Sequence, residues 1–449
     1  MWLGAAALAP LLLFPLIRAP VMGLVLGGTV LAVLAAWHTP ALPLALAGLP
    51  GVLFALLGPN PLPAGGVSAI LAVWTALGVA FVVMRGRDVP PPRVGLAAPV
   101  VLTALLALLM LARLPAESLS DYGGVKLQLF VVGNAMFVVG GVFIGWRPPD
   151  LNVLLMVMLA IATLTAVVLV VRFGTGGAAE VLPGRFSISP EDDPISLARG
   201  AAEGLLIAVY LMLSRRAATT RLWAVAALPA LAIAVVASGS RGPVVGLTFG
   251  LVVLLALAVT HARARRRLLV VAAAALVAVV AVVQTVPTST LSRSLEVIVA
   301  SGSDLSSNGR SQLWAAAWEG FLKHPLLGVG TGGFADLRAA EIYPHNFLLE
   351  GAVELGILGL LAVAALVAWT FVRIGRGWRE AQDEDRLLAG VVAALFSMAV
   401  VNALFSSAIP NNKEVWLWSG VAAGLSARLL RDRGVSRRES WQLGPRTRS

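Results

Sequence analysis

Apolar stretches of about 20 residues follow one another along almost the whole of this 449-residue chain, and they constrain its fold more than any other feature. A helix needs about 20 residues to cross roughly 30 Å of hydrocarbon, whereas a membrane barrel would show short alternating strands. Hydrophobic residues make up 58% of the chain and charged residues only 13%, against about 25% in soluble domains. The sequence therefore predicts an all-α polytopic membrane protein.

We expect about 12–14 transmembrane helices. The amino terminus has no basic stretch and no cleavage site for a signal peptidase, so it is predicted to form the first span. The expected organisation is 1–286 with the first eleven spans, 287–345 as a large outer loop, 346–430 with the last three spans, and 431–449 as a basic cytoplasmic tail. The predicted spans are 2–17, 19–36, 41–58, 66–84, 95–114, 125–145, 151–172, 196–214, 222–238, 243–260, 268–286, 346–372, 387–405 and 414–430.

The positions of the basic residues predict the orientation of these spans. If the amino terminus is cytoplasmic, most of the 34 Lys and Arg residues fall in cytoplasmic loops and in the tail. The net charge of +11 then reflects topology and contact with anionic lipids, and it does not indicate nucleic-acid binding. The chain has no cysteine, which excludes disulfides and thiol chemistry.

The longest polar stretch runs from 285 to 345, on the predicted outer side. Loops of this length are uncommon unless they are functional. Asn308 can cap a helix there, and apolar residues then recur at helical spacing with two tryptophans among them. We expect this helix to lie in the membrane interface. Its apolar positions are Leu313, Trp314, Ala317, Trp318, Phe321 and Leu322.

Two of the four histidines, His324 and His345, fall on the predicted outer side, where either could accept a proton. His324 also suits packing or capping at the end of the interfacial helix. His345 stands where the long loop re-enters the membrane, and interface anchoring is its alternative role. Glu350 and Glu354 follow it on one helix face, in an apolar zone where ionisable groups are usually functional. They could orient the imidazole or pair with arginines, and they are candidate catalytic residues with His345.

Arginines on the same side could bind an anion. Arg241 precedes Pro243 at the start of a span, where free backbone N–H groups and the helix dipole favour negative charge; an interfacial turn is the alternative. Arg199 begins another span and could simply pair with Glu203. Arg310 heads the interfacial helix, a poor position for a cation unless an anion binds nearby. Further candidates are Tyr122, Lys126, Arg172 and Arg185.

Two local patterns resemble other sites. The Gly-rich run 328–333 lacks the Gly-Lys-Ser/Thr of a phosphate loop, so we do not interpret it as a nucleotide site. The acidic turn 191–193 is short and beside a proline, which favours a solvated turn over a metal site.

Four motifs in order resemble the O-antigen ligase and polymerase superfamily. They are Ser-Arg-Gly at 240–242, Asn-Gly-Arg-Ser-Gln-Leu-Trp at 308–314, His-Pro-Leu-Leu-Gly-Val-Gly-Thr-Gly-Gly-Phe at 324–334, and His-Asn-Phe-Leu-Leu-Glu at 345–350, with Glu-Leu-Gly at 354–356 after it. The resemblance covers roughly 185 to 375. It implies a GT-C-like helical membrane fold in the bacterial inner membrane, with the active site facing the periplasm.

The resemblance also implies an activity. A family member would transfer a glycan from an undecaprenyl pyrophosphate carrier to an acceptor hydroxyl, with inversion and without a cofactor or metal. His345 matches the essential loop histidine, and Arg199 and Arg241 match pyrophosphate-binding positions. An O-antigen ligase acting on lipid A core is the leading expectation. Alternatives are a polysaccharide polymerase, a protein O-oligosaccharyltransferase and, in another class, a lipid or solute transporter.

Overall fold

The computed structural model describes residues 93–114, 122–190, 193–260, 262–291, 310–337 and 341–442. The four spans predicted between residues 2 and 84 lie outside these ranges. Each of the other ten predicted spans coincides with a helix. Eight helical segments in the described part of the chain are long and apolar enough to cross a membrane, judged by length and composition. The prediction of an all-α polytopic membrane protein is confirmed.

The elements follow one another in chain order, and the two short strands form an antiparallel hairpin between α9 and α10. They are α6 (Arg93–Ala112), α7 (Tyr122–Gln128), the π-helical η1 (Leu129–Ala135), α8 (Met136–Trp146), α9 (Pro148–Gly174), β1 (Ala179–Leu182), β2 (Arg185–Ser187), α10 (Pro194–Leu213), α11 (Ala218–Ala237), α12 (Arg241–Ala258), α13 (Ala262–Thr285), α15 (Arg310–Lys323), α16 (Phe334–Leu337), α17 (Phe347–Glu380), α18 (Asp383–Phe405), η3 (Ile409–Asn411) and α19 (Lys413–Gln442).

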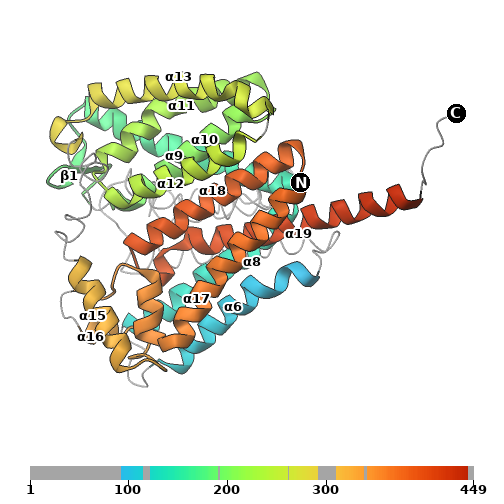
Figure 1. Ribbon diagram of the computed structural model, residues 1–449. Helices are drawn as coiled ribbons and strands as arrows, with labels where there is room; N and C mark the ends of the chain where they lie inside the picture. The colour runs from blue at the N-terminus through green and yellow to red at the C-terminus, as the bar shows by residue number, and fades with distance from the viewer. Residues whose placement is uncertain are drawn as a thin grey trace, which may run out of the picture.

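The helices form two adjoining groups, which Figure 1 shows one above the other. Helices α9 to α13 pack together in the first group, and α6, α8, α17 and α19 in the second. Helix α18 joins them, because it packs extensively on α12 and also on α17 and α19. The two groups therefore form one bundle, in which the spans lie roughly side by side.

Small residues allow α8 and α19 to pack with their backbones almost in contact. A Cβ atom added at Gly141 would lie 2.6 Å from the carbonyl oxygen of Leu417, and one at Gly424 would lie 2.8 Å from the amide nitrogen of Trp146. Such Gly-based contacts are typical of helices that associate within a membrane, where van der Waals packing replaces the hydrophobic effect. This close packing fixes the position of α19 against α8.

Helix α17 is broken at Gly356, whose backbone is left-handed (φ 67°). The Gly-rich segment 324–333 supplies the hydrogen bonds that the break removes. The carbonyl of Val353 accepts from the amide of Val329 (2.8 Å), and the amide of Ile357 donates to the carbonyl of Pro325 (2.8 Å). The amides of Val329 and Gly330 therefore donate to the broken helix, at the carbonyls of Val353 and Glu354.

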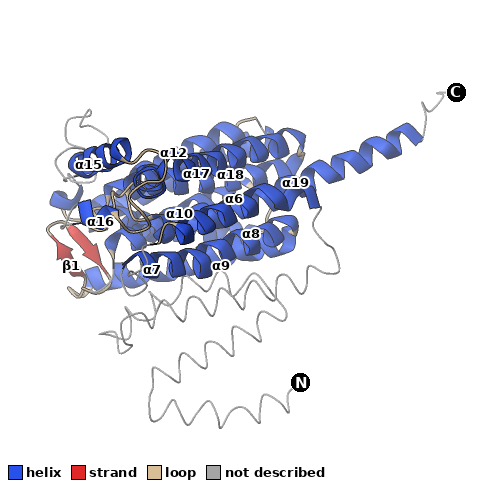
Figure 2. Cartoon of the chain, turned by 90° about the horizontal axis from the view of Figure 1, so that it is seen from below, coloured by secondary structure: helices blue, strands red, loops and turns tan. Residues whose placement is uncertain are grey.

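One end of the bundle, here called the site end, gathers the elements on which the candidate residues lie. The hairpin and α15 stand there in Figure 1, together with the first residues of α12. Helix α15 is the helix that the sequence predicted within the long loop. In Figure 1 its axis crosses the direction of α11 to α13. Figure 2 shows the long α19 leaving the bundle at the opposite end.

Candidate functional site

His345 lies at the site end, in the turn that leads into α17. Its backbone is left-handed (φ 55°), a conformation uncommon for a residue with a side chain. The next residue, Asn346, caps α17 by accepting hydrogen bonds from the amides of Leu348 and Leu349, each at 3.1 Å. The cap and the turn fix the imidazole at the mouth of the helix, where 21% of its side chain remains exposed.

Both nitrogens of the His345 ring have neighbours. Nδ1 accepts a hydrogen bond from the amide of Ser407 at 3.4 Å, and Nε2 lies 3.6 Å from a carboxylate oxygen of Glu341. The ring of Tyr343 contacts the imidazole edge-on, with 4.6 Å between centroids. Burial and, after it, the charge of Arg310 lower the pKa of His345, while Glu341 acts in the opposite direction. The imidazole is therefore mainly neutral near pH 7 and able to accept a proton.

The segment between α18 and η3, which the sequence analysis did not single out, holds several site residues together. The ring of Phe405 packs on Trp314 of α15, with 6.0 Å between centroids. The carbonyl of Ser406 accepts from Arg199 at 3.4 Å, and the amide of Ser407 donates to His345. Ser407 is itself left-handed, with φ 66°. Because consecutive Cα atoms are about 3.8 Å apart, this segment brings the predicted histidine and one predicted arginine close together.

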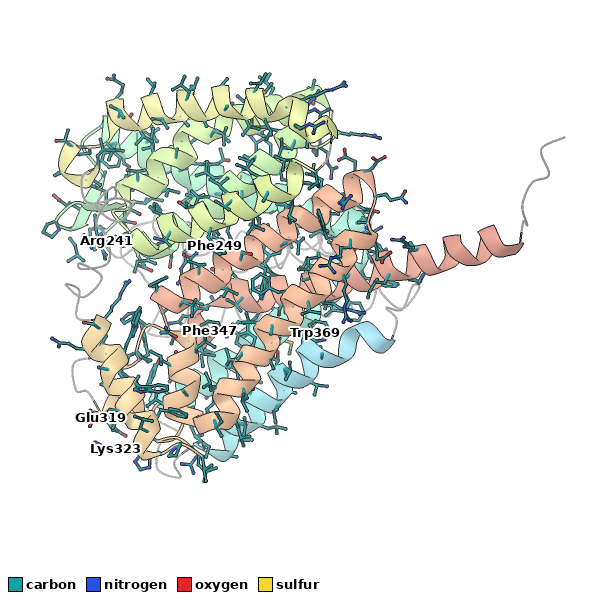
Figure 3. All side chains as sticks on the ribbon, viewed as in Figure 1. Arg241, Phe249, Glu319, Lys323, Phe347 and Trp369 are labelled. Atoms are coloured by element: carbon teal, nitrogen blue, oxygen red, sulfur yellow. The ribbon has the colours of Figure 1, made fainter. Side chains whose placement is uncertain are left out.

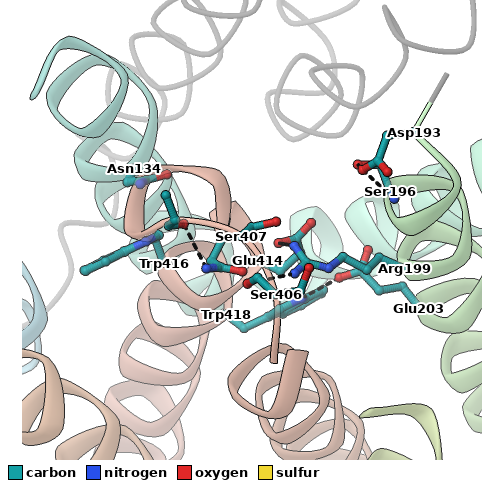
Figure 4. A network of polar contacts seen from close by, with 12 residues as sticks. Asn134, Asp193, Ser196, Arg199, Glu203, Ser406, Ser407, Glu414, Trp416 and Trp418 are labelled. Atoms are coloured by element: carbon teal, nitrogen blue, oxygen red, sulfur yellow. Dashed lines mark hydrogen bonds and ion pairs between the residues drawn. The ribbon is translucent and has the colours of Figure 1, made fainter. Parts of the chain in front are cut away.

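Arg199 begins the second turn of α10 and is 5% exposed. Its nearest carboxylate is that of Glu414 on α19, at 3.9 Å, and not that of Glu203 as the spacing allowed. Glu203 instead accepts from the indole N–H of Trp418 at 3.2 Å. Figure 4 shows these side chains converging between α10 and α19. The guanidinium is held by a weak ion pair and a long hydrogen bond, so it retains capacity for another acceptor.

Arg241 is the first residue of α12, and Pro243 stands in the first turn as the sequence predicted. The Ser240 hydroxyl donates to the carbonyl of Ser238 and does not cap the helix. The turn before α12 lies against the hairpin, because a Cβ added at Gly239 would approach the side chain of Arg185 to 3.1 Å. The hairpin thus brings a second arginine beside Arg241, which Figure 3 places at the site end.

Arg310, the first residue of α15, connects these arginines electrostatically. Burial lowers its pKa, and the guanidiniums of Arg185, Arg241 and Arg199 lower it further. No ion pair joins Arg310 to a carboxylate among the described residues. Like charges at close range repel one another and favour the binding of an anion. We call Arg185, Arg199, Arg241 and Arg310 the guanidinium cluster.

Lys126, Glu350 and Glu354 form a second charged group, here called the buried triad. All three side chains are almost completely buried. The Lys126 ammonium contacts Oε1 of Glu350 at 2.5 Å and also pairs with Glu354. Glu350 further accepts from the amide of Ile409 at 2.8 Å. The structure thus brings the two predicted glutamates to Lys126, and no hydrogen bond or ion pair joins either of them to His345 or to the guanidinium cluster in the described ranges.

The remaining candidates lie apart from His345. The ring of Tyr122 faces the Lys126 ammonium at 5.7 Å and so belongs to the surroundings of the buried triad. Arg172 donates to the carbonyl of Ile188 at 2.6 Å and supports the hairpin. His324 is exposed, and Asp193 caps α10, whereas Glu191 and Asp192 lie outside the described residues. Within the described ranges, no three His, Cys, Asp or Glu side chains are grouped as metal ligands.

A known protein and a protein family are similar to this chain in sequence. A 221-residue alignment is 30% identical to the Exopolysaccharide production protein ExoQ of Rhizobium meliloti (strain 1021). It covers 45% of this chain and 45% of that protein, so the chain spans about half the length of the relative that it matches. Residues 226–364 match the O-antigen ligase family. This region includes Arg241, Arg310 and His345, and it is similar to the family that the motifs resemble.

Proposed function

We propose that the protein is a membrane glycosyltransferase of the bacterial inner membrane. It moves a glycan from a polyprenyl pyrophosphate carrier to an acceptor hydroxyl at the periplasmic face. The observation that carries the proposal is that a mainly neutral imidazole and several guanidiniums share the site end. The segment 405–407 contacts both His345 and Arg199, and Arg310 acts electrostatically on both His345 and the other arginines.

In the proposed reaction, the pyrophosphate of the donor binds the guanidinium cluster, with Arg199, Arg241 and Arg310 as its principal ligands. Arginine suits this role because its planar donors match phosphate oxygens. His345 accepts the proton of the acceptor hydroxyl as its oxygen attacks the anomeric carbon. The bond from that carbon to the phosphate oxygen breaks, and the guanidiniums stabilise the leaving pyrophosphate. Direct attack inverts the anomeric centre.

The buried triad has a supporting role in this scheme. Glu350 and Glu354 were predicted among the catalytic residues, and Lys126 and Tyr122 among the pyrophosphate ligands. Their mutual contacts favour a different role. The charge of Lys126 is already balanced by two carboxylates, and Glu350 holds Ile409, two residues beyond Ser407. We infer that the triad fixes the segment 405–412 on which His345 and Arg199 depend.

Two acceptors fit the proposed donor. The family description names an O-antigen ligase, for which we propose lipid A core as the acceptor. The relative concerned with exopolysaccharide production favours a polymerase, in which a second carrier-linked glycan is the acceptor. We keep the ligase as the leading proposal and the polymerase as the alternative. A transporter would release no new glycosidic product, so product analysis separates it from both enzymes.

The test uses the purified protein in nanodiscs with a polyprenyl-pyrophosphate oligosaccharide and, separately, lipid A core, a second carrier-linked glycan and a peptide. We expect a transferred glycan on one acceptor without added nucleotide. His345→Ala should lower turnover by about 10²–10⁴, the usual contribution of a general base, and should leave the unfolding temperature unchanged. His324→Ala is the matched control, because this histidine is exposed, and it should retain activity. Near-normal turnover of His345→Ala would refute the proposal.

A further inference from the structure

Glu341 stands beside the proposed general base, although nothing in the sequence pattern marked it. Its carboxylate lies 3.6 Å from Nε2 of His345, four residues further along the chain. The left-handed backbone of His345 and the Asn346 cap fold the turn so that the two side chains meet. The Glu341 side chain is 48% exposed, so burial does not force this contact. The left-handed turn at His345 brings the two side chains together.

The two neighbours of the imidazole select the same tautomer. An ionised carboxylate only accepts hydrogen bonds, so Glu341 favours a proton on Nε2. A backbone amide only donates, so Ser407 requires a lone pair on Nδ1. Both contacts therefore place the hydrogen on Nε2 and the basic lone pair on Nδ1. Agreement between two independent partners, from different segments of the chain, makes this an oriented base.

We propose that Glu341 is a positioning residue that holds the proton of His345 on Nε2 and so leaves Nδ1 to take the proton of the acceptor hydroxyl. This inference rests on the proposed function. The hydrogen bond from the Ser407 amide to Nδ1 is long, at 3.4 Å. It breaks when the acceptor oxygen approaches Nδ1. The proton moves from that oxygen to Nδ1, while the oxygen electron pair forms the glycosidic bond and the pyrophosphate leaves. The imidazolium formed faces Glu341, whose charge stabilises it.

The charged and titratable groups around the imidazole come from three segments. Arg310 approaches from α15 and disfavours the imidazolium, whereas Glu341 on the same loop favours it. Tyr343 presents an uncharged ring, and the segment after α18 contributes the Ser407 amide. Burial and Arg310 keep the pKa of His345 below its ordinary value, and Glu341 limits that effect. Loss of the carboxylate should therefore make the imidazole a weaker base.

The experiment compares Glu341→Gln, which keeps the size of the side chain and removes its charge, with Glu319→Gln as a matched control. Glu319 is an exposed carboxylate of α15 that pairs with Lys323, and it is not among the groups that shift the pKa of His345. Nitrogen-15 NMR of histidine-labelled protein in nanodiscs, without substrate, reports the tautomer and the pKa of His345; the signal is assigned by its loss in His345→Ala. Transfer is then measured against pH with the polyprenyl-pyrophosphate oligosaccharide and its acceptor.

In Glu341→Gln we expect a lower pKa of His345 and a smaller fraction of the Nε2–H tautomer. The acidic limb of the pH–rate profile should move to lower pH, because the base must be neutral, and the plateau should fall by about tenfold to a hundredfold. A tautomer and a pKa equal to those of wild type would overturn the inference even if transfer fell. The proposed function fails separately, if His345→Ala retains turnover.

Discussion

The buried triad and the guanidinium cluster both bring charged side chains together, but their charges are balanced in different ways. In the triad, Lys126 sits between two carboxylates and all three side chains are shielded from solvent. In the cluster, Arg310 faces three other guanidiniums and has no carboxylate partner among the described residues. The triad satisfies its charges internally, whereas Arg310, its pKa already lowered by burial, lies among like charges that lower it further. The comparison supports our proposal that the triad stabilises the fold and that the cluster, with Arg310, binds the anionic part of the donor.

The physical cost of each arrangement supports this division. Charges taken out of water are tolerated when they are paired at short range, and removal of one partner leaves an uncompensated charge. A cation at a partly exposed position, such as Arg310, costs less because solvent screens it, and an anionic ligand converts its repulsion with like charges into binding energy. Substitutions in the triad should therefore affect stability first, and substitutions in the cluster should affect transfer first.

The largest effect should follow from Lys126→Met, which leaves two buried carboxylates without their cation. We expect a loss of about 3–5 kcal/mol in the free energy of unfolding, measured by denaturant unfolding of the purified protein. Lys323→Met is the control, because Lys323 forms an exposed pair with Glu319 and should contribute about 0–1 kcal/mol.

A neutral version of the triad sharpens this test. Combining Lys126→Met with Glu350→Gln and Glu354→Gln removes all three charges, so much of the lost stability should return. If the single variant were as stable as wild type yet inactive, Lys126 would belong with the substrate-binding cations after all, and the division between the two regions would fail.

The next effect should follow from Arg310→Gln. Loss of one preorganised charge contact to the leaving group costs about 10²–10³ in turnover. Stability should stay level or rise, because repulsion with Arg185, Arg199 and Arg241 decreases. The measurement is kcat for glycan transfer beside the unfolding temperature, with the exposed Arg266→Gln on α13 as control. A fall in stability with unchanged turnover would place Arg310 with the structural charges.

The same comparison explains what the sequence could predict. His345, Arg241 and Arg310 were identifiable because each lies at the end of a helix or apolar run, so topology alone assigns them to one side. The ten spans within the described ranges were identifiable from hydropathy for a similar reason. The spans of a membrane protein and their ends can be recognised from the local sequence, because each span must be a helix that satisfies its own backbone hydrogen bonds.

Contacts between distant residues were not predictable in this way. Lys126 and Glu354 were both singled out, but 228 positions separate them, and only the three-dimensional fold brings them close enough to pair. Ser406 and Ser407 act through backbone groups, which any residue supplies, so their side chains gave no signal. Glu341 could have been noted from its i, i+4 spacing to His345, but that spacing has meaning only once the turn between them is known.

The smallest effect concerns Glu414, the carboxylate that pairs with Arg199. Its contact with Arg199 is long, at 3.9 Å, and its side chain is 30% exposed. Such pairs contribute about 0.2–1 kcal/mol, so Glu414→Gln should barely change stability. It should also strengthen donor binding by up to about fivefold, because a competing anion is removed and Arg199 becomes fully available.

The KM for the lipid-linked donor, measured at fixed acceptor, checks this expectation. A carboxylate in the buried triad holds its cation in place, but a carboxylate at the edge of the cluster competes with the substrate for its cation. Weaker donor binding in Glu414→Gln would mean that Glu414 orients Arg199 and does not compete for it. In that case Glu414 would hold Arg199 as the triad carboxylates hold Lys126. The two regions would then differ only in how far their charged side chains are exposed to solvent.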